Sequence, residues 1–294
     1  MRILRLETSS LAIVASVFLI TPNIRAQEGT EKSAEATAEK VRGLEQEYSA
    51  AKKEWLADYR AASKEDRAEL MSSRPLPATW FPKFYAILEA NPKAGAAARA
   101  GMWIVSNRAA RGSDLAKTLG ILQVHHVDNQ GMDRICSSLS RNPSQSVVKF
   151  LKTVAAKSPH TDIRGIACLN LAMCLKNQAD TVRKLKTGDE SQLRRVVDTF
   201  GRETVDILKN ADADEIEKAA ESYFAKVTET PEYADVTFRR SLIAETAEAS
   251  LFEMRNLGIG KVAPEIDGED IEANPIKLSD YRGKVVVLDF WGDW

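Results

Sequence analysis

The cysteines of this 294-residue sequence are few, and their spacing limits the chemistry that they can do. Cys168 and Cys174 lie in one segment of helical spacing, which places them on different faces and about 9 Å apart along the axis. A disulfide needs Cα atoms within about 7 Å, so these two thiols cannot bond to each other. No two of the three cysteines, Cys136, Cys168 and Cys174, have the Cys-x-x-Cys spacing of a redox or zinc site. The sequence therefore predicts buried core thiols, and in an oxidising compartment Cys136 could pair with one of them.

The histidines and the known sequence motifs add no catalytic or metal site. His125, His126 and His160 are accompanied by no Cys or carboxylate set at metal-ligand spacing, so we expect no metal and no cofactor. The sequence contains no Gly-rich phosphate loop and no Gly-x-Ser-x-Gly nucleophile elbow. The basic run at 183–186 is typical of a solvated helix face or turn.

Composition and charge exclude several function classes. The chain is 44% hydrophobic and 28% charged, which excludes wholesale disorder, a collagen-like fibre and a polytopic membrane protein. Its length is typical of two domains. The formal net charge is −1, so no overall basic field recruits nucleic acid, and we expect no nucleic-acid partner.

The N-terminal residues 1–26 have the layout of a secretory signal peptide. A short basic start is followed by the apolar run 11–20, a breaker at Pro22 and an expected cleavage site after Ala26. The apolar run is too short for a permanent membrane anchor. We therefore expect an exported protein of the periplasm or cell envelope of a bacterium. The small, polar residues 27–40 are expected to form a flexible leader.

The long middle part of the chain, residues 41–257, has the apolar spacing of helices. Val41, Leu44, Tyr48 and Trp55 recur every three or four residues and predict a helix that faces a partner helix. Little β-branched alternation occurs before residue 260, so we predict an all-α domain. Prolines and capping residues divide the rest of this domain into helices near 79–90, 93–110, 114–127, 131–140, 144–157, 161–178, 189–209, 213–227 and 231–256.

One segment of this domain, residues 162–172, resembles the inner helix of a HEAT-like repeat. Asp162 can cap the helix, and the small Ala167 and Ala172 admit a neighbouring helix closely. Such helix pairs stack in α-solenoids. No fixed period repeats, so an irregular helical bundle stays open beside solenoid-like helical pairs. We expect the helical domain to position partner proteins or to mediate self-association.

The C-terminal residues 258–294 change from a helical to a β texture. The segments 262–266 and 275–278 are extended, and Asp267-Gly268 is a turn pair. The apolar run 285–291 is typical of a strand that is buried on both faces. Without neighbouring strands both its edges stay open, so we expect this run to be disordered or prone to aggregation.

This C-terminal stretch resembles the opening of a thioredoxin-like redoxin domain of the TlpA-type and thiol-specific-antioxidant (alkyl hydroperoxide reductase) group. The matching elements are Gly-x-x-Ala-Pro at 260–264, Leu-Ser-Asp-Tyr-Arg-Gly-Lys at 278–284 and Phe-Trp-x-x-Trp at 290–294. The resemblance implies the first strands of an α/β thioredoxin-like fold. It also implies a thiol–disulfide oxidoreductase that acts on protein thiols or disulfides or on a redox partner protein. A thiol peroxidase with antioxidant activity is an alternative.

The sequence departs from the family pattern at the most consequential place. In the family, a Cys-x-x-Cys begins after the second Trp, and its first cysteine attacks as a thiolate. This sequence ends before that motif, so no residue is carried over as catalytic, and the 294-residue chain is expected to be inactive. Trp291, Gly292, Asp293 and Trp294 are carried over as the flank that shapes the active site.

Several explanations of this departure stay open. One hypothesis is that the next codon is a UGA that is read as selenocysteine, and a gene fragment, a frameshift and a pseudogene are its alternatives. The other functional class is a non-catalytic helical interaction protein with a vestigial redoxin segment.

Overall fold

The computed structural model describes residues 21–258 and 260–292 of the chain. Most of the predicted signal peptide lies outside the described residues. Among those that are described, no helix combines the length and apolar character that a membrane crossing requires. The helices are α1 (Thr21–Ala61), α2 (Lys64–Ser72), α3 (Pro77–Ala90), α4 (Gly95–Ser106), α5 (Gly112–His125), α6 (Met132–Leu139), α7 (Gln145–Lys157), α8 (Thr161–Thr187), α9 (Glu190–Phe200), α10 (Arg202–Lys209), α11 (Ala213–Glu229) and α12 (Ile243–Asn256).

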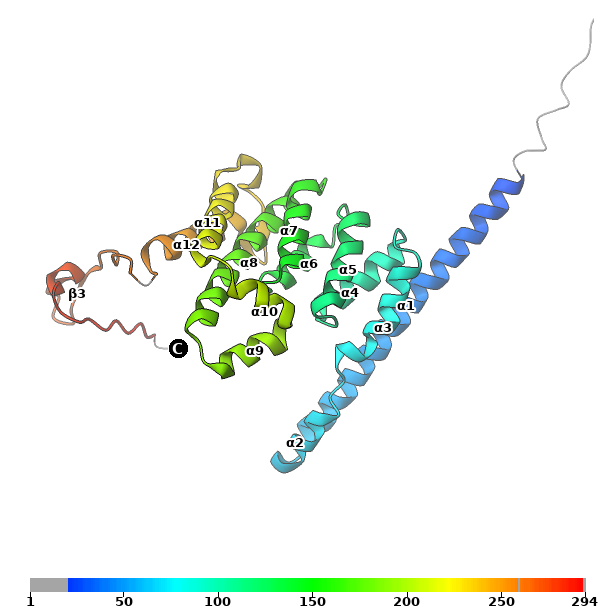
Figure 1. The fold of residues 1–294 in the computed structure, drawn as a ribbon, viewed down its shortest axis with the longest axis horizontal. Helices are drawn as coiled ribbons and strands as arrows, with labels where there is room; N and C mark the ends of the chain where they lie inside the picture. Colours follow the sequence, from blue (N-terminus) through cyan, green and yellow to red (C-terminus); the bar gives the residue numbers. More distant parts are fainter. Residues whose placement is uncertain (1–20, 259, 293–294) are drawn as a thin grey trace, which may run out of the picture.

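These helices confirm the predicted all-α domain. Figure 1 shows them in a row from α1 to α12, in which most helices pack against neighbours that are near in the sequence. The long helix α8 lies at the centre of the second half, where α6 and α7 pack on it from the preceding part of the chain and α11 from the following part.

Apart from a small separate cluster of Ala179, Val182, Leu208 and Ala213 on α8, α10 and α11, one continuous apolar core runs through the row. Its largest fully buried side chains include Phe84, Phe150 and Phe224. Phe84 stacks on Trp103 with ring centroids 3.8 Å apart. Tyr48 of α1 lies edge-on to Trp103 at 5.3 Å, so the predicted apolar stripe of α1 faces partner helices. The aromatic residues of α1 therefore serve packing.

The residues 27–40 are helical in the structure and are not a flexible leader. They form part of α1, which extends without interruption from Thr21 to Ala61. The physical reason is their content of Ala, Glu and Lys, which are strong helix formers, together with the absence of proline between Pro22 and Pro75. Most side chains between residues 33 and 40 are exposed, so helix propensity rather than burial explains this segment.

Two of the predicted helices are broken in the structure. The segment 189–209 divides at Gly201, whose φ of +87° is a left-handed conformation that ends α9. The segment 231–256 begins with the 3₁₀ turn η1 (Pro231–Tyr233) and continues as a hairpin of β1 (Thr237–Phe238) and β2 (Ser241–Leu242) before α12 starts. Tertiary contacts of Tyr233 and Ile243 with α8 explain the second break, because helical periodicity alone does not encode them.

The contact of α8 with Tyr233 and Ile243 depends on a glycine. A Cβ atom on Gly165 would lie 2.7 Å from Cδ1 of Ile243 and 3.0 Å from Cδ1 of Tyr233. We expect Gly165→Ala to lower the free energy of unfolding by about 1 kcal/mol or more, because overpacking outweighs the gain in helix propensity. Urea unfolding monitored by circular dichroism measures this change.

Gly120 of α5 is the matched control, because a Cβ atom there would meet nothing within 4 Å. Gly120→Ala should raise the free energy of unfolding by about 0.5–1 kcal/mol. Equal effects of the two substitutions would contradict the close approach at Gly165.

A second hairpin follows the helical domain. The strands β3 (Asp267–Glu269) and β4 (Pro275–Lys277) pair antiparallel with Gly268 opposite Ile276. The predicted turn pair Asp267-Gly268 thus lies within a strand, and the turn itself lies at 270–274, where Asp270 accepts hydrogen bonds from the backbone of Glu272 and Asn274. Among the described residues, none after Met254 belongs to the apolar core.

Candidate functional site

The predicted active-site flank lies at the end of an exposed apolar segment, residues 285–292. Among the described residues, this segment makes no strand pairing, and it is not the buried strand that the apolar run predicts. The side chains of Val285 and Trp291 are 97% and 84% exposed. A strand buried on both faces requires neighbours on both edges, and the described residues supply none. Of the four flank residues, Trp291 and Gly292 are described, and Asp293 and Trp294 lie outside the described residues.

The turn that precedes this segment is held by its own hydrogen bonds. The carboxylate of Glu265 accepts a hydrogen bond from the backbone N–H of Ser279 at 2.9 Å, and hydrogen bonds from Ser279 lower the pKa of Glu265. The backbone N–H of Leu278 donates to the carbonyl of Ile266, also at 2.9 Å. The 3₁₀ turn η2 (Leu278–Tyr281) is therefore fixed against β4 and sets the direction in which the apolar segment leaves.

The three cysteines lie in the helical core and are free. Burial raises the pKa of Cys168 to about 11 and that of Cys174 to about 12, and it raises the pKa of Cys136 further. The thiol of Cys174 donates to the carbonyl of Asn142 at 3.0 Å. A nucleophilic cysteine needs the opposite environment, which is partly exposed and electropositive. The prediction that these thiols are core residues is confirmed.

The histidines have structural contacts. Nε2 of His126 lies 2.6 Å from the carbonyl of Pro92, and burial lowers the pKa of this imidazole. Nε2 of His160 lies 2.8 Å from the carbonyl of Asp128. Each ring thus contacts the backbone of a loop that is distant in the sequence. Within the described part of the chain, no three His, Cys, Asp or Glu side chains are grouped so that they could hold a metal ion.

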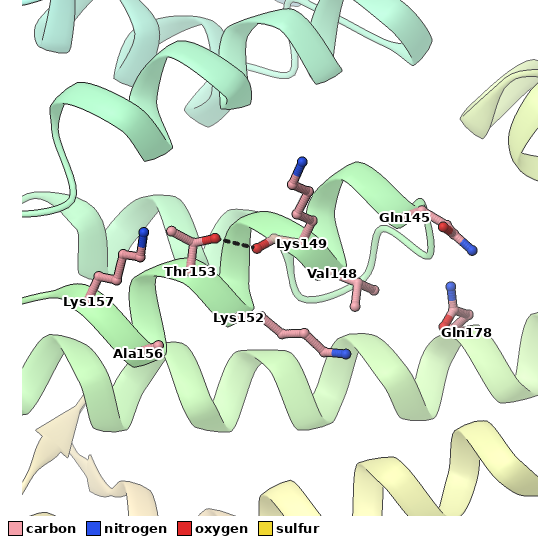
Figure 2. Close-up of a pocket in the computed structure, with 8 residues that line it drawn as sticks. All are labelled: Gln145, Val148, Lys149, Lys152, Thr153, Ala156, Lys157 and Gln178. Atoms are coloured by element: carbon pink, nitrogen blue, oxygen red, sulfur yellow. Dashed lines mark hydrogen bonds between the residues drawn. The ribbon is translucent and has the colours of Figure 1, made fainter.

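An open concavity of about 500 Å³ lies along α7 (Figure 2). Lys149, Lys152 and Lys157 line it, but Figure 2 shows that Lys149 and Lys157 point away from the side on which Lys152 lies. Thr153 donates its hydroxyl to the carbonyl of Lys149 at 2.9 Å. The lining contains no carboxylate, thiol or imidazole, so it has no adjacent base that could activate its lysine or threonine side chains as nucleophiles.

Comparison with known proteins gives short local matches. No protein-family model matches the chain, and no solved structure matches it. The chain is similar to "Thiol-disulfide oxidoreductase ResA" of Geobacillus thermodenitrificans, with 42% identity over 50 residues, which is 17% of this chain and 29% of that protein. It is 43% identical to ResA of Geobacillus kaustophilus over 42 residues, 14% of this chain and 24% of that protein. ResA of Bacillus thuringiensis is 50% identical over 36 residues, 12% of this chain and 21% of that protein.

The chain thus spans less than a third of the length of the curated relatives that it matches. These matches support a relationship to thioredoxin-like thiol–disulfide oxidoreductases, as the sequence motifs predict. The helical domain is much longer than any of the matched segments.

Proposed function

We propose that the whole protein is an exported thiol–disulfide oxidoreductase whose thioredoxin-like domain opens at Gly260. The 42% identity to ResA over 50 residues carries this proposal. The structure supports it through the order of local elements in this part of the chain, because a hairpin, a 3₁₀ turn and an extended apolar run follow one another.

The chemistry of the proposed exchange requires a thiolate that reaches a substrate disulfide. None of the three core thiols meets this requirement, because each is buried with a raised pKa. The family pattern has its Cys-x-x-Cys directly after the second Trp, here Trp294, and a selenocysteine in the first position is the separate hypothesis. The first thiolate or selenolate attacks a substrate sulfur, and the mixed bond that forms is broken by the second cysteine. The substrate gains two electrons as a dithiol, and the enzyme is left with an internal disulfide or selenenylsulfide.

The helical domain has its own place in this proposal. It has a continuous core from Val41 to Met254 that includes no described residue of the β3–β4 hairpin or of the segment that follows it. We infer that it presents protein partners to the redox domain or joins copies of the protein. The same independence favours the second candidate function, a helical interaction protein whose redoxin segment is vestigial.

The nucleotide sequence that follows codon 294 distinguishes the two functions. The oxidoreductase requires a codon for cysteine, or a UGA with selenocysteine insertion, and then a cysteine three positions on and an open frame of about a hundred residues. A decayed frame would favour the interaction protein. The product of a complete frame should reduce insulin in the presence of dithiothreitol, whereas the chain of residues 1–294 should not. Insulin reduction by the shorter chain at the same rate would contradict the proposed site.

A further inference from the structure

A second concavity, of about 590 Å³, lies where four parts of the helical domain meet. Its walls come from the end of α4, from α6 and the loop after it, from the middle of α8, and from the β1–β2 hairpin with the start of α12. The lining residues are Ser106, Arg108, Ser137, Ser138, Ser140, Arg141, Leu169, Asn170, Met173, Phe238, Arg239, Ser241, Ile243 and Thr246.

Three exposed arginines line this concavity, each from a separate loop. Arg108 follows α4, Arg141 follows α6, and Arg239 lies in the turn of the hairpin. The lining contains no carboxylate, and among the described residues these three guanidinium groups form no ion pair. Like charges that gather without a counter-charge create a positive potential that attracts an anion. The concavity is therefore a focus of uncompensated positive charge.

The backbone at two of these arginines is strained. Arg108 has a φ of +54° and Arg239 a φ of +51°, and Arg240 beside it has a φ of +73°. A two-residue hairpin turn with positive φ at both positions normally uses Asn-Gly or Asp-Gly, because in most other residues the Cβ atom crowds the backbone at positive φ. Such strain persists at functional sites, where the side chain is needed at that position. The guanidinium of Arg239 lies over the ring of Phe238, 5.3 Å from its centroid, and both residues line the concavity.

The lining of the concavity also offers hydrogen-bond groups. Ser137 and Asn170 are buried there, and Asn170 donates to the carbonyl of Ile166 at 2.7 Å. The hydroxyls of Ser138, Ser140 and Thr246 donate to backbone carbonyls. Among the described residues, the hydroxyls of Ser106, Ser137 and Ser241 donate to no protein group, Ser106 and Ser241 are exposed, and each hydroxyl can rotate to donate to a ligand.

We propose that this concavity binds a small molecule that carries a phosphate or diphosphate group, with Arg108, Arg141 and Arg239 around the phosphate oxygens. A guanidinium group presents paired N–H donors that match phosphate oxygens, and serine hydroxyls complete such sites. The volume lies within the range of small-molecule sites, about 300–1,000 Å³. This size favours a small phosphorylated ligand over an acidic protein segment. The proposal does not depend on the redox function.

Inorganic pyrophosphate, titrated calorimetrically into the full chain at constant ionic strength, tests this site. Wild-type protein should bind it more tightly than chloride or a tetraglutamate peptide. Arg239→Gly should weaken the binding about tenfold or more, since loss of one charged hydrogen-bonding partner removes roughly that factor. Arg240→Gly is the matched control, because Arg240 has the same strained backbone and does not line the concavity.

The two glycine variants separate binding from strain. Both should raise the melting temperature, because glycine adopts positive φ without a steric penalty, but only Arg239→Gly should lose affinity. Absence of pyrophosphate binding to the wild type at millimolar concentration would overturn the proposal. Equal losses in both variants would show general attraction to charge and would overturn it as well, as would tighter binding of the glutamate peptide.

Discussion

The three cysteines are expected to react with a dithiobis-nitrobenzoate reagent far more slowly in the folded protein than in the chain unfolded by guanidinium. At pH 8 an ordinary thiol with a pKa near 8.5 is about one-quarter thiolate. With pKa values of about 11 and about 12, Cys168 and Cys174 have thiolate fractions of only about 10⁻³ and 10⁻⁴. The higher intrinsic nucleophilicity of a thiolate with a high pKa recovers about tenfold of this loss for Cys168. The raised pKa alone therefore slows the reaction of Cys168 with the reagent by about twentyfold.

Access to the reagent slows the reaction further. Cys136, Cys168 and Cys174 are all buried, so the reagent reaches them only when the helical domain opens. Ala249→Cys supplies an exposed reference thiol on α12 of the same protein. Stopped-flow absorbance should show one rapid thiol per chain in that variant and none in the wild type, and three in the unfolded wild type. A rapidly reacting thiol in the wild type would contradict the burial of the three cysteines and would make them candidates for redox groups.

The same burial gives the stability of the protein a pH dependence. The thiol pKa values of the folded state lie above those of the unfolded state, so the thiols contribute stability below about pH 8.5. This contribution falls as the pH rises toward about 11, because the unfolded chain loses its thiol protons first. Replacement of Cys174 by Ala should reduce this loss of stability between pH 8 and pH 10.

The sequence predicts most of the helices because their boundaries are local. Pro143 precedes α7, Pro159 precedes α8, and Asn91-Pro92 follows α3, and each of these signals acts within a few residues. Periodicity could not predict the break at 234–242, since the hairpin depends on packing of Tyr233 and Ile243 against Gly165. For residues 27–40, the small and polar composition suggests a flexible segment, but their Ala, Glu and Lys residues have a high helix propensity.

The candidate sites differ in how far the sequence reveals them. The redoxin flank is visible because its motif elements follow one another closely in the sequence, from Leu278 to Trp294. The phosphate site is assembled from residues up to about a hundred and thirty positions apart, so no local pattern shows that Arg108 and Arg239 share one concavity. The one local signal is the pair Arg239-Arg240 at a turn, and a helical interpretation of 231–256 conceals it.

Phe224→Ala should cause the largest loss of stability among single substitutions in the second half of the helical row. Phe224 lies on α11, is fully buried, and belongs to the continuous core that joins α11 to α8. Truncation of a buried phenylalanine removes its transfer free energy and leaves a cavity, which together cost about 3–5 kcal/mol. A domain of this kind has a total stability of about 5–15 kcal/mol, so the variant loses a large part of it.

Phe252→Ala on α12 is the matched control, because the same atoms are removed from a side chain that is 51% exposed. It should change the free energy of unfolding by less than about 1 kcal/mol, since little buried surface is lost and no cavity forms. Urea unfolding should show a lower midpoint for Phe224→Ala with an unchanged slope. Equal shifts in the two variants would mean that α11 does not pack on α8 as described. A changed slope with loss of only part of the helical signal would instead show that the row unfolds in sections, as expected when stability comes from contacts between neighbouring helices.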